Sequence, residues 1–310
     1  MVGTLREFLN VMCNSLECYE SGSDWMEKII VIGASGYLGT AITDLASRTY
    51  PVIATYRTTP CLVNNRNTSH ERVDFDDQQS VMAILQFIQT TDIVIVASNV
   101  EYGSPNKTIL DNYHGLLHTL QRISIKTIFI SSDAVFDGKE EKYAEDSAPN
   151  PITDYGRRKF KSERIIGAGQ NLIIRTSYLY GSNRYVVDKR FQEIESAAKN
   201  GHTINKPTNL IRNPIHVVDL AKVILLLKEK TGIFHVAGPR MSTYTFYHFL
   251  AKEAGINVDI KEVMLNQEQA NEIPLNTNLI SNKLRSLEIH IPSMEENSGR
   301  IYPGSRANYT

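Results

Sequence analysis

The sequence is poor in cysteine and has no excess of charge of either sign. Its 310 residues include only three cysteines, Cys13, Cys18 and Cys61. A low and odd count predicts reduced thiols in a cytoplasmic protein rather than a secreted disulfide framework. The 33 Lys and Arg residues nearly balance the 34 Asp and Glu residues, and the net charge is −1. This balance argues against a nucleic-acid partner, because proteins that bind nucleic acids usually carry a strong basic excess.

Long apolar runs are also missing. The apolar runs at 93–97 and 223–227 are far shorter than the roughly 18 apolar residues that a membrane-spanning helix needs. The first residues do not resemble a signal peptide, because Arg6 is followed directly by Glu7 and because Asn10 interrupts any apolar stretch. We therefore expect no membrane association.

What is present is the composition of an ordinary globular protein, with 42% hydrophobic and 22% charged residues. A chain of this length buries roughly 75% of the surface of its unfolded form, so it needs no disulfide or metal to fold. His114 and His118 have the i, i+4 spacing of zinc ligands, but no third ligand is near them in the sequence. We expect ordinary helix-surface histidines there and no metal site. The length fits one large domain, or a core domain with a smaller partner.

Residues 1–25 differ from the rest of the chain and are expected to form an N-terminal extension. Leu5, Phe8 and Met12 have helical spacing, and a polar linker follows at 20–24. Met26 stands just before an apolar run, 29–32, that is typical of the first strand of a nucleotide-binding fold. Our hypothesis is that Met26 begins the functional core, and that 1–25 is an added segment or an upstream start.

Short apolar runs alternate with amphipathic stretches from Met26 to Arg175. The expected strands are 29–32, 52–56, 72–73, 93–97, 127–131 and 172–175, with a later one at 232–236. The expected helices between them are 38–46, 80–88, 109–123 and 155–166. This alternation predicts an α/β protein of the Rossmann type, with a doubly wound parallel sheet covered on both faces. After Arg175 the regular alternation ends.

A glycine-rich loop, G-x-x-G-x-x-G, follows the first expected strand. Gly33 allows a tight turn, Gly36 allows the backbone to approach a pyrophosphate, and Gly39 lets the next helix pack closely on the strand. The N-terminus of that helix offers free N–H groups to phosphate oxygens. A glycine pattern alone is a weak signal, and the alternative is a turn without a ligand. Its place between a strand and a helix favours a cofactor loop formed by Gly33, Ser35, Gly36, Tyr37, Leu38 and Gly39.

The ends of the next strands suggest which cofactor this loop holds. A site for NAD usually has an acidic residue at the end of the second strand, where this sequence has Arg57. Arg57 could pair with a 2′-phosphate, which predicts NADP(H), or it could be one more surface arginine. Asp74, next to Phe75, could reach the adenine amino group. A helix-capping turn after it fits that stretch almost as well. Ala97 and Ser98, after the fourth strand, complete the expected cofactor contacts.

Tyr155 and Lys159 form a Y-x-x-x-K pair on one face of an expected helix. The lysine would lower the pKa of the tyrosine toward the working range and would hold the cofactor ribose. Such a pair is often accidental, but this one lies downstream of Ser132, which directly follows the fifth expected strand, where open α/β sheets bind ligands. We expect Ser132 to bind a substrate carbonyl oxygen and Tyr155 to supply the proton. Asn112 would anchor a water relay to Lys159, or it is simply a polar residue on a helix surface.

Together these residues resemble the extended short-chain dehydrogenase/reductase family, and within it the dTDP-4-dehydrorhamnose reductases. The segment 130–138 resembles I-S-T-D-Y-V-F-D-G, and 148–151 with Tyr155 and Gly156 resembles P-x-N-P…Y-G-x-x-K. The segments 175–181 and 235–238 resemble R-T-S-W-V-Y-G and H-V-A-G. The likeness runs from Met26 to about Leu287. It implies NADPH-linked reduction of a 4-keto-6-deoxy nucleotide sugar.

The resemblance also implies a second, smaller C-terminal domain that binds the substrate. We predict an NADP-binding Rossmann domain at 26–175, to which 217–238 returns, and a substrate-binding domain at 176–216 and 239–310. The substrate contacts expected are Ser132, Asp133, Tyr155, Tyr178 and Arg212, the last as a phosphate ligand or equally as part of a surface salt bridge. A homodimer could form through a helix pair at the sheet edge.

Three departures from the group's pattern leave alternatives open. Ser132 replaces a threonine, Ala134 replaces a tyrosine, and 97–101 lacks the usual A-A-x-T-x-V-D. Ser132 keeps the hydroxyl, whereas the other two departures put the identity of the sugar in doubt more than the type of reaction. A nucleotide-sugar epimerase or dehydratase is one rival. Such enzymes hold NAD tightly, and the missing acidic residue after the second strand argues against an NAD site here. The other rival is a regulatory subunit without activity, similar to the methionine adenosyltransferase β subunit.

Overall fold

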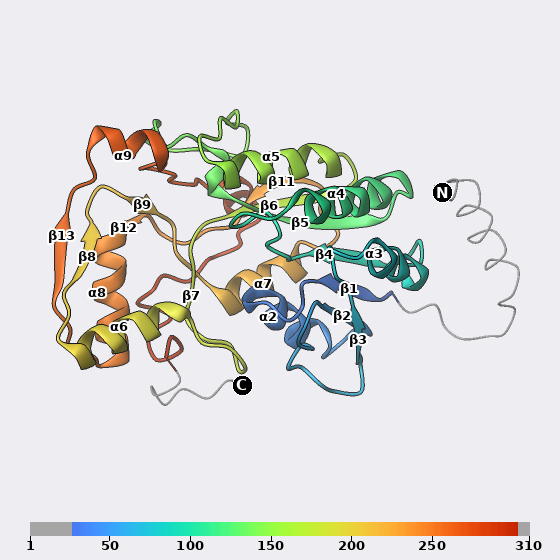
Figure 1. Cartoon of the computed structure of the whole chain (residues 1–310), viewed down its shortest axis with the longest axis horizontal. Coiled ribbons are helices and arrows are strands. Elements are labelled where there is room, and N and C mark those ends of the chain that lie inside the picture. Colours follow the sequence, from blue (N-terminus) through green and yellow to red (C-terminus); the bar gives the residue numbers. More distant parts are fainter. Residues whose placement is uncertain (1–26, 303–310) are drawn as a thin grey trace, which may run out of the picture.

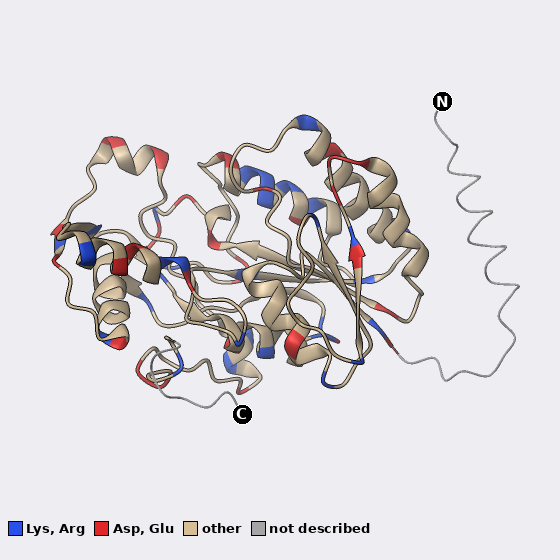
Figure 2. Cartoon of the chain, turned by 60° about the horizontal axis from the view of Figure 1, so that its bottom comes forward, with Lys and Arg blue, Asp and Glu red and all other residues tan. Residues whose placement is uncertain are grey.

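The computed structural model describes residues 27–302 (Figure 1), and Figure 2 shows the same chain in a second view with its charged residues coloured. The expected extension at 1–25 lies outside the described residues, and so do Met26, Cys13 and Cys18. Cys61 is buried and has a free thiol. In the part of the chain that is described, every helix is too short or too polar to cross a membrane.

A sheet of seven parallel strands forms the centre of the molecule. Its strands are β1 (Ile29–Ile32), β2 (Val52–Tyr56), β3 (Thr68–Arg72), β4 (Ile93–Val96), β5 (Lys126–Ser132), β6 (Leu172–Thr176) and β11 (Gly232–His235). They lie in the order β11-β6-β5-β4-β1-β2-β3, and every neighbouring pair is parallel. The order reverses at β1 and β4, which makes the sheet doubly wound. The predicted fold class is therefore confirmed.

Helices cover both faces of the sheet because successive strand residues point to opposite sides. Ile29 and Val31 pack toward α2 (Tyr37–Ala46) and α7 (Val217–Leu226), whereas Ile30 and Ile32 pack toward the other face. That second face is covered by α3 (Gln78–Ile84), the short η1 (Leu85–Phe87), α4 (Lys107–Arg122) and α5 (Asp154–Ile166). Figure 1 shows α4 and α5 on one side of the sheet and α2 and α7 on the other. Burial on both faces explains why the central strands are uninterrupted apolar runs.

The third strand lies earlier in the chain than the sequence predicted. It runs from Thr68 to Arg72 rather than over 72–73, and Thr68 pairs with Val52 of β2. β3 is an edge strand made of polar, half-exposed residues. Apolar patterning therefore carries no signal there, and the strand forms because β2 offers it backbone partners.

A smaller second part of the chain has a hydrophobic cluster of its own, built around Phe191, Ile194, Phe246 and Leu250. Its elements are β7 (Leu179–Tyr180), α6 (Lys189–Asn200), β8 (Ile204–Pro207), β9 (Ile211–Arg212), β10 (Ile215–His216), β12 (Met241–Ser242), α8 (Thr243–Ala254), β13 (Ile260–Val263) and α9 (Gln267–Glu272). β8 and β13 form a parallel pair, and Figure 1 shows them at the end of the molecule away from β3.

The chain crosses between the two parts more than once. α7 packs against α2, and β11 extends the large sheet beside β6. The short α10 (Asn282–Ser286) also returns to the large sheet, because Leu284 packs in the same cluster as α2 and α7. The exact domain boundaries proposed from the sequence stay a prediction.

Candidate active site

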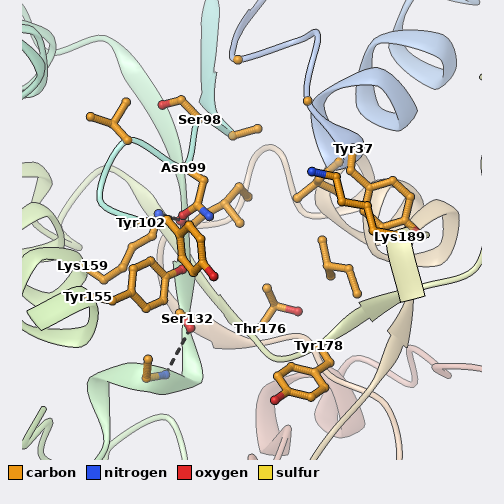
Figure 3. Close-up of a pocket in the computed structure, with 18 of the residues that line it drawn as sticks. Tyr37, Ser98, Asn99, Tyr102, Ser132, Tyr155, Lys159, Thr176, Tyr178 and Lys189 are labelled. Carbon is orange, nitrogen blue, oxygen red and sulfur yellow. Dashed lines mark hydrogen bonds between the residues drawn. The ribbon is translucent and has the colours of Figure 1, made fainter. Parts of the chain in front are cut away.

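One large cavity of about 1500 Å³ opens at the carboxyl ends of the parallel strands, between the sheet and the smaller part (Figure 3). This is where open α/β sheets bind their ligands. Most of the predicted site residues line this one cavity: Gly33, Ser35, Gly36, Tyr37, Leu38, Arg57, Asp74, Phe75, Ala97, Ser98, Ser132, Asp133, Tyr155, Lys159, Tyr178 and Arg212. Gly39 and Asn112 are the predicted residues that do not line it.

The glycine loop has the backbone geometry of a phosphate cradle. Gly33 adopts a positive φ of 87°, which residues with a Cβ rarely adopt. A Cβ placed on Gly39 would lie 2.1 Å from the Gly33 carbonyl oxygen, so α2 can approach β1 only with a glycine there. The N-cap of α2 is Gly36, whose lack of a side chain leaves the first turn uncapped. The uncapped helix N-terminus therefore fits a pyrophosphate.

This packing predicts that Gly39→Ala destabilises the protein although alanine is the better helix former. The added methyl group collides with backbone atoms, and overpacking of this kind costs roughly 1–3 kcal/mol. Gly115→Ala on α4 is the matched control, because nothing lies within 4 Å of its Cβ position. The control should be stabilised by about 0.5–1 kcal/mol. Urea denaturation measures both, and equal stabilisation of the two variants would contradict the packing role of Gly39.

Arg57 is exposed at the end of β2 and lines the cavity. Its side chain has no hydrogen-bond or ion-pair partner among residues 27–302. Its neighbour Arg72 donates from Nε to the Arg57 carbonyl oxygen at 3.1 Å and pairs through Nη2 with Asp74 at 2.6 Å. Asp77 caps α3 by accepting from the Gln79 N–H. Among the described residues Arg57 is thus an unpaired cation at the cavity wall, whereas the Asp74 carboxylate is already paired.

Tyr155, Lys159 and Ser132 meet on one wall of the cavity (Figure 3). α5 begins just before Tyr155, where Thr153 caps it by accepting from the Gly156 N–H at 3.0 Å. Lys159 lies one turn later and is buried, and its Nζ donates to the Ile130 carbonyl oxygen of β5 at 3.0 Å. The spacing that the sequence showed therefore places phenol and ammonium together beside the end of β5.

The expected lowering of the Tyr155 pKa is wrong for this arrangement. Burial raises the pKa of Tyr155, and the Lys159 ammonium opposes that rise without overcoming it. The carboxylates of Glu101 and Asp133 add to the rise, while the nearby Ser132 hydroxyl works against it. For Lys159, burial lowers the pKa, but the nearby Glu101 and Tyr155 outweigh burial and the pKa lies above its usual value. Both groups therefore hold their protons at neutral pH.

Ser132 and Asp133 connect the end of β5 to the smaller part. The Ser132 Oγ accepts from the Ala134 N–H and donates to the Asp133 carboxylate, both at 3.1 Å. Asp133 also accepts from Ser177 at 2.7 Å and from Thr277 at 2.6 Å. Ser132 can therefore reach a substrate oxygen only by turning its hydroxyl hydrogen away from Asp133.

Two predicted residues make other contacts. The Arg212 guanidinium donates to the carbonyl oxygens of Ile211 and Pro274 at 2.7 and 2.9 Å, and its Nε lies 3.7 Å from Asp133. Asn112 donates to the Phe75 carbonyl oxygen at 2.9 Å, which fastens α4 to the loop after β3. The phosphate role of Arg212 and the relay role of Asn112 stay predictions.

Sequence reasoning missed three residues of the cavity region. Glu101 is fully buried, and its Oε2 lies 3.2 Å from Lys159 Nζ. Tyr102 is 71% exposed and places its ring edge-on to that of Tyr155, with the centroids 5.8 Å apart. Lys189 lines the opposite side near Tyr37, and its side chain has no partner within the described ranges (Figure 3). For Glu101 the only signal in the sequence was that 97–101 departs from the group's pattern.

Known proteins resemble this chain over most of its length. It is 26% identical over 250 residues to the methionine adenosyltransferase 2 subunit beta of Xenopus tropicalis, covering 70% of this chain and 68% of that protein. It is 25% identical over 252 residues to the dTDP-4-dehydrorhamnose reductase of Aggregatibacter actinomycetemcomitans, covering 74% and 80%.

Solved structures share its fold. The dTDP-4-dehydrorhamnose reductase of Bacillus anthracis, crystallised with NADP, superposes with a TM-score of 0.68 at 23% identity, covering 89% of this chain and 98% of that one. The UDP-glucose 4-epimerase of Thermus thermophilus, solved with NAD, superposes with a TM-score of 0.71 at 18% identity, covering 88% and 97%. The family model described as the RmlD substrate binding domain matches residues 26–302, which span the sheet, the cavity and the smaller part. The chain therefore belongs to the RmlD substrate binding domain family.

Proposed function

We propose that this chain is an NADPH-dependent reductase of a 4-keto-6-deoxy nucleotide sugar, of the dTDP-4-dehydrorhamnose reductase kind. The observation that carries the proposal is the cavity itself, which brings Tyr155, Lys159 and Ser132 together with the glycine loop. A dinucleotide whose pyrophosphate lies at α2 would extend along the ends of the strands toward Tyr155. The curated reductase that the chain resembles and the reductase structure with NADP support the same conclusion.

The residues present fit this cofactor. The glycine loop and the uncapped α2 N-terminus suit its pyrophosphate. Arg57, which is free of partners in the described chain, suits a 2′-phosphate at the end of β2. Lys159 donates one N–H to the Ile130 carbonyl oxygen, and its Nζ forms an ion pair with Glu101 at 3.2 Å, so its ammonium keeps an N–H for a ribose hydroxyl.

The protein's own residues would bind and orient the keto sugar and supply a proton. When bound, NADPH supplies the hydride that reduces the carbonyl carbon. Ser132 and Tyr155 would hold the carbonyl oxygen, and the Tyr155 hydroxyl would transfer its proton to the alkoxide as negative charge develops there. The raised pKa of Tyr155 suits a proton donor, because the group stays protonated at neutral pH. Lys189 lies across the cavity and has no partner among the described residues. Its ammonium could pair with the diphosphate of the nucleotide sugar.

A steady-state assay tests the proposal. We expect the purified protein to oxidise NADPH when dTDP-4-dehydro-L-rhamnose is added, and to do so faster than with NADH. The absorbance of the reduced cofactor reports the rate. If NADPH binds but is not oxidised with this or any related keto sugar, the reductase proposal is wrong.

A second candidate is a regulatory subunit that keeps the fold and a bound dinucleotide without turnover. The similarity to the methionine adenosyltransferase 2 subunit beta over 70% of the chain favours it. So does Glu101, because a lysine that pairs with a buried carboxylate is a structural element as well as a catalytic one. Co-purification with a larger catalytic partner, together with absent turnover, is the result that this candidate predicts.

The cofactor preference gives a prediction of its own. We expect Arg57→Ala to weaken NADPH binding about tenfold to a hundredfold, because a hydrogen bond to a charged group contributes about 1.5–3 kcal/mol. NADH binding should change little, since it has no 2′-phosphate. Arg66→Ala is the matched control, because Arg66 is also exposed but does not line the cavity. Fluorescence titration measures both cofactors, and equal loss for both would show that Arg57 does not read the 2′-phosphate.

A further inference from the structure

The loop after β4 is fastened to α5 beside the predicted catalytic residues. Arg158 donates from Nε to the Glu101 carbonyl oxygen at 2.9 Å and from Nη2 to the Gly103 carbonyl oxygen at 2.7 Å. Ser162, one turn further along α5, donates to Glu101 Oε1 at 2.9 Å. These contacts place the carboxylate of Glu101 directly behind Lys159, where Lys159 Nζ and Glu101 Oε2 are 3.2 Å apart.

This ion pair lies inside the protein. The side chains of Lys159 and Glu101 are 4% and 0% exposed, so water does not screen their charges. The Lys159 ammonium is held between β5, through the Ile130 carbonyl oxygen, and the loop after β4, through Glu101. A buried pair at this distance fixes the position of the lysine and nearly cancels its charge.

We propose that Glu101 is a positioning residue whose buried carboxylate holds Lys159 in place and offsets its charge beside Tyr155, so that the site donates a proton. This inference rests on the proposed function for the role of Tyr155, and it adds a residue that the motif does not contain. Without Glu101, the uncompensated ammonium would favour the phenolate, which accepts a proton instead of giving one.

Other charged groups also face this centre. Asp133, across the cavity wall, acts on Tyr155 in the same direction as Glu101. Glu163, further along α5, also faces Lys159 but is paired with Arg175 at 2.8 Å. Arg212 lies 3.7 Å from Asp133 and reduces its influence.

Two side chains of α4 face Glu101. Tyr113 is fully buried, and burial together with Glu101 raises its pKa well above the usual value, so its hydroxyl stays neutral. Burial lowers the pKa of His114, with Lys161 acting in the same direction and Glu101 opposing both, so the imidazole is neutral at pH 7. Both α4 side chains are therefore neutral, and Glu101 is the carboxylate in ion-pair contact with Lys159.

The titration of Tyr155 tests the inference without any need for turnover. Fluorine NMR of protein labelled with fluorotyrosine, with NADP+ added, follows each tyrosine, and Tyr155→Phe identifies the signal of Tyr155. Glu101→Gln should lower the midpoint of that signal by about one pH unit or more, since one unit is the low end of the effect of a close charge. An unchanged midpoint would overturn the proposal.

A second buried carboxylate provides the control. Asp92, 1% exposed, lies at the other end of the strands and pairs with Lys28 at 3.2 Å. Asp92→Asn removes a buried charge but should leave the Tyr155 midpoint where it is. A midpoint that falls equally in both variants would show a general effect of destabilisation and would overturn the proposal.

A second pair of variants decides the question if Glu101→Gln does not fold. Lys159→Gln alone should raise the Tyr155 midpoint, because the carboxylate then acts without the cation. The double variant, Lys159→Gln with Glu101→Gln, should lower the Tyr155 midpoint by about one pH unit relative to Lys159→Gln alone. Equal midpoints in these two variants would overturn the proposal. Because the readout is a titration, absent NADPH oxidation in the wild-type protein would reject the proposed function and leave this test intact.

Discussion

Replacing Tyr155 with phenylalanine should lower kcat about a hundredfold to ten-thousandfold, which is the range that a positioned proton donor contributes. The phenol lies in the cavity wall with Ser132, and burial raises its pKa, so it keeps the proton that the reaction requires. The ring itself remains in Tyr155→Phe, and it keeps its edge-on contact with Tyr102. Cofactor affinity and the fold should therefore change little.

Steady-state kinetics and a binding titration with NADPH measure the two effects separately. Tyr50→Phe is the matched control, because Tyr50 is half-buried and does not line the cavity. It should leave turnover near the wild-type value. Near-normal kcat in Tyr155→Phe would remove Tyr155 from the mechanism, whereas a loss of NADPH binding would assign it to the cofactor site instead.

Replacing Lys159 with methionine should have the largest effect on stability. The substitution strands the Glu101 carboxylate, which is fully buried, and breaking a buried ion pair on one side costs roughly 3–5 kcal/mol. The loss should shrink as the pH falls, because a stranded buried carboxylate has a raised pKa and takes up a proton. Urea denaturation across a range of pH measures both effects.

Two further variants show whether the loss comes from the stranded charge. Lys159→Met with Glu101→Gln should be more stable than Lys159→Met alone, since neither charge then remains. Lys28→Met should cost much less stability, because the Lys28 side chain is 23% exposed. Its partner Asp92 also still accepts hydrogen bonds from the backbone N–H groups of residue 28 and Gln89 in that variant. If the double variant is no more stable than Lys159→Met, the buried pair does not account for the loss.

The sequence predicted the parallel sheet well because burial on both faces leaves a clear pattern. The runs 29–32 and 93–97 are uninterrupted apolar segments, and the glycine loop follows the first of them. β3 could not be placed in this way, since an edge strand with polar side chains has no apolar pattern and depends on β2 for its hydrogen bonds. The packing of Leu284 against the large sheet could not be predicted either, because it depends on contacts that are distant in sequence.

The site was predictable where its residues have fixed local spacing. Tyr155 and Lys159 lie one helical turn apart, and Ser132 ends a strand, so their meeting follows from the fold. Glu101 was not predictable, because a single acidic residue in a loop gives no sign that it is buried. Burial raises the pKa of Tyr155, and Glu101 adds to the rise. Neither effect is visible in the sequence, which shows only the nearby lysine.

Transfer of deuterium tests the central claim most directly. The protein is incubated with dTDP-4-dehydro-L-rhamnose and NADPH that carries deuterium at the transferable position, and the sugar product is analysed by mass spectrometry. We predict a reduced sugar nucleotide that contains one deuterium from the cofactor, formed by the wild-type protein and not by Tyr155→Phe. Deuterium that stays on the cofactor, with the keto sugar unchanged, would contradict the account and leave the regulatory candidate.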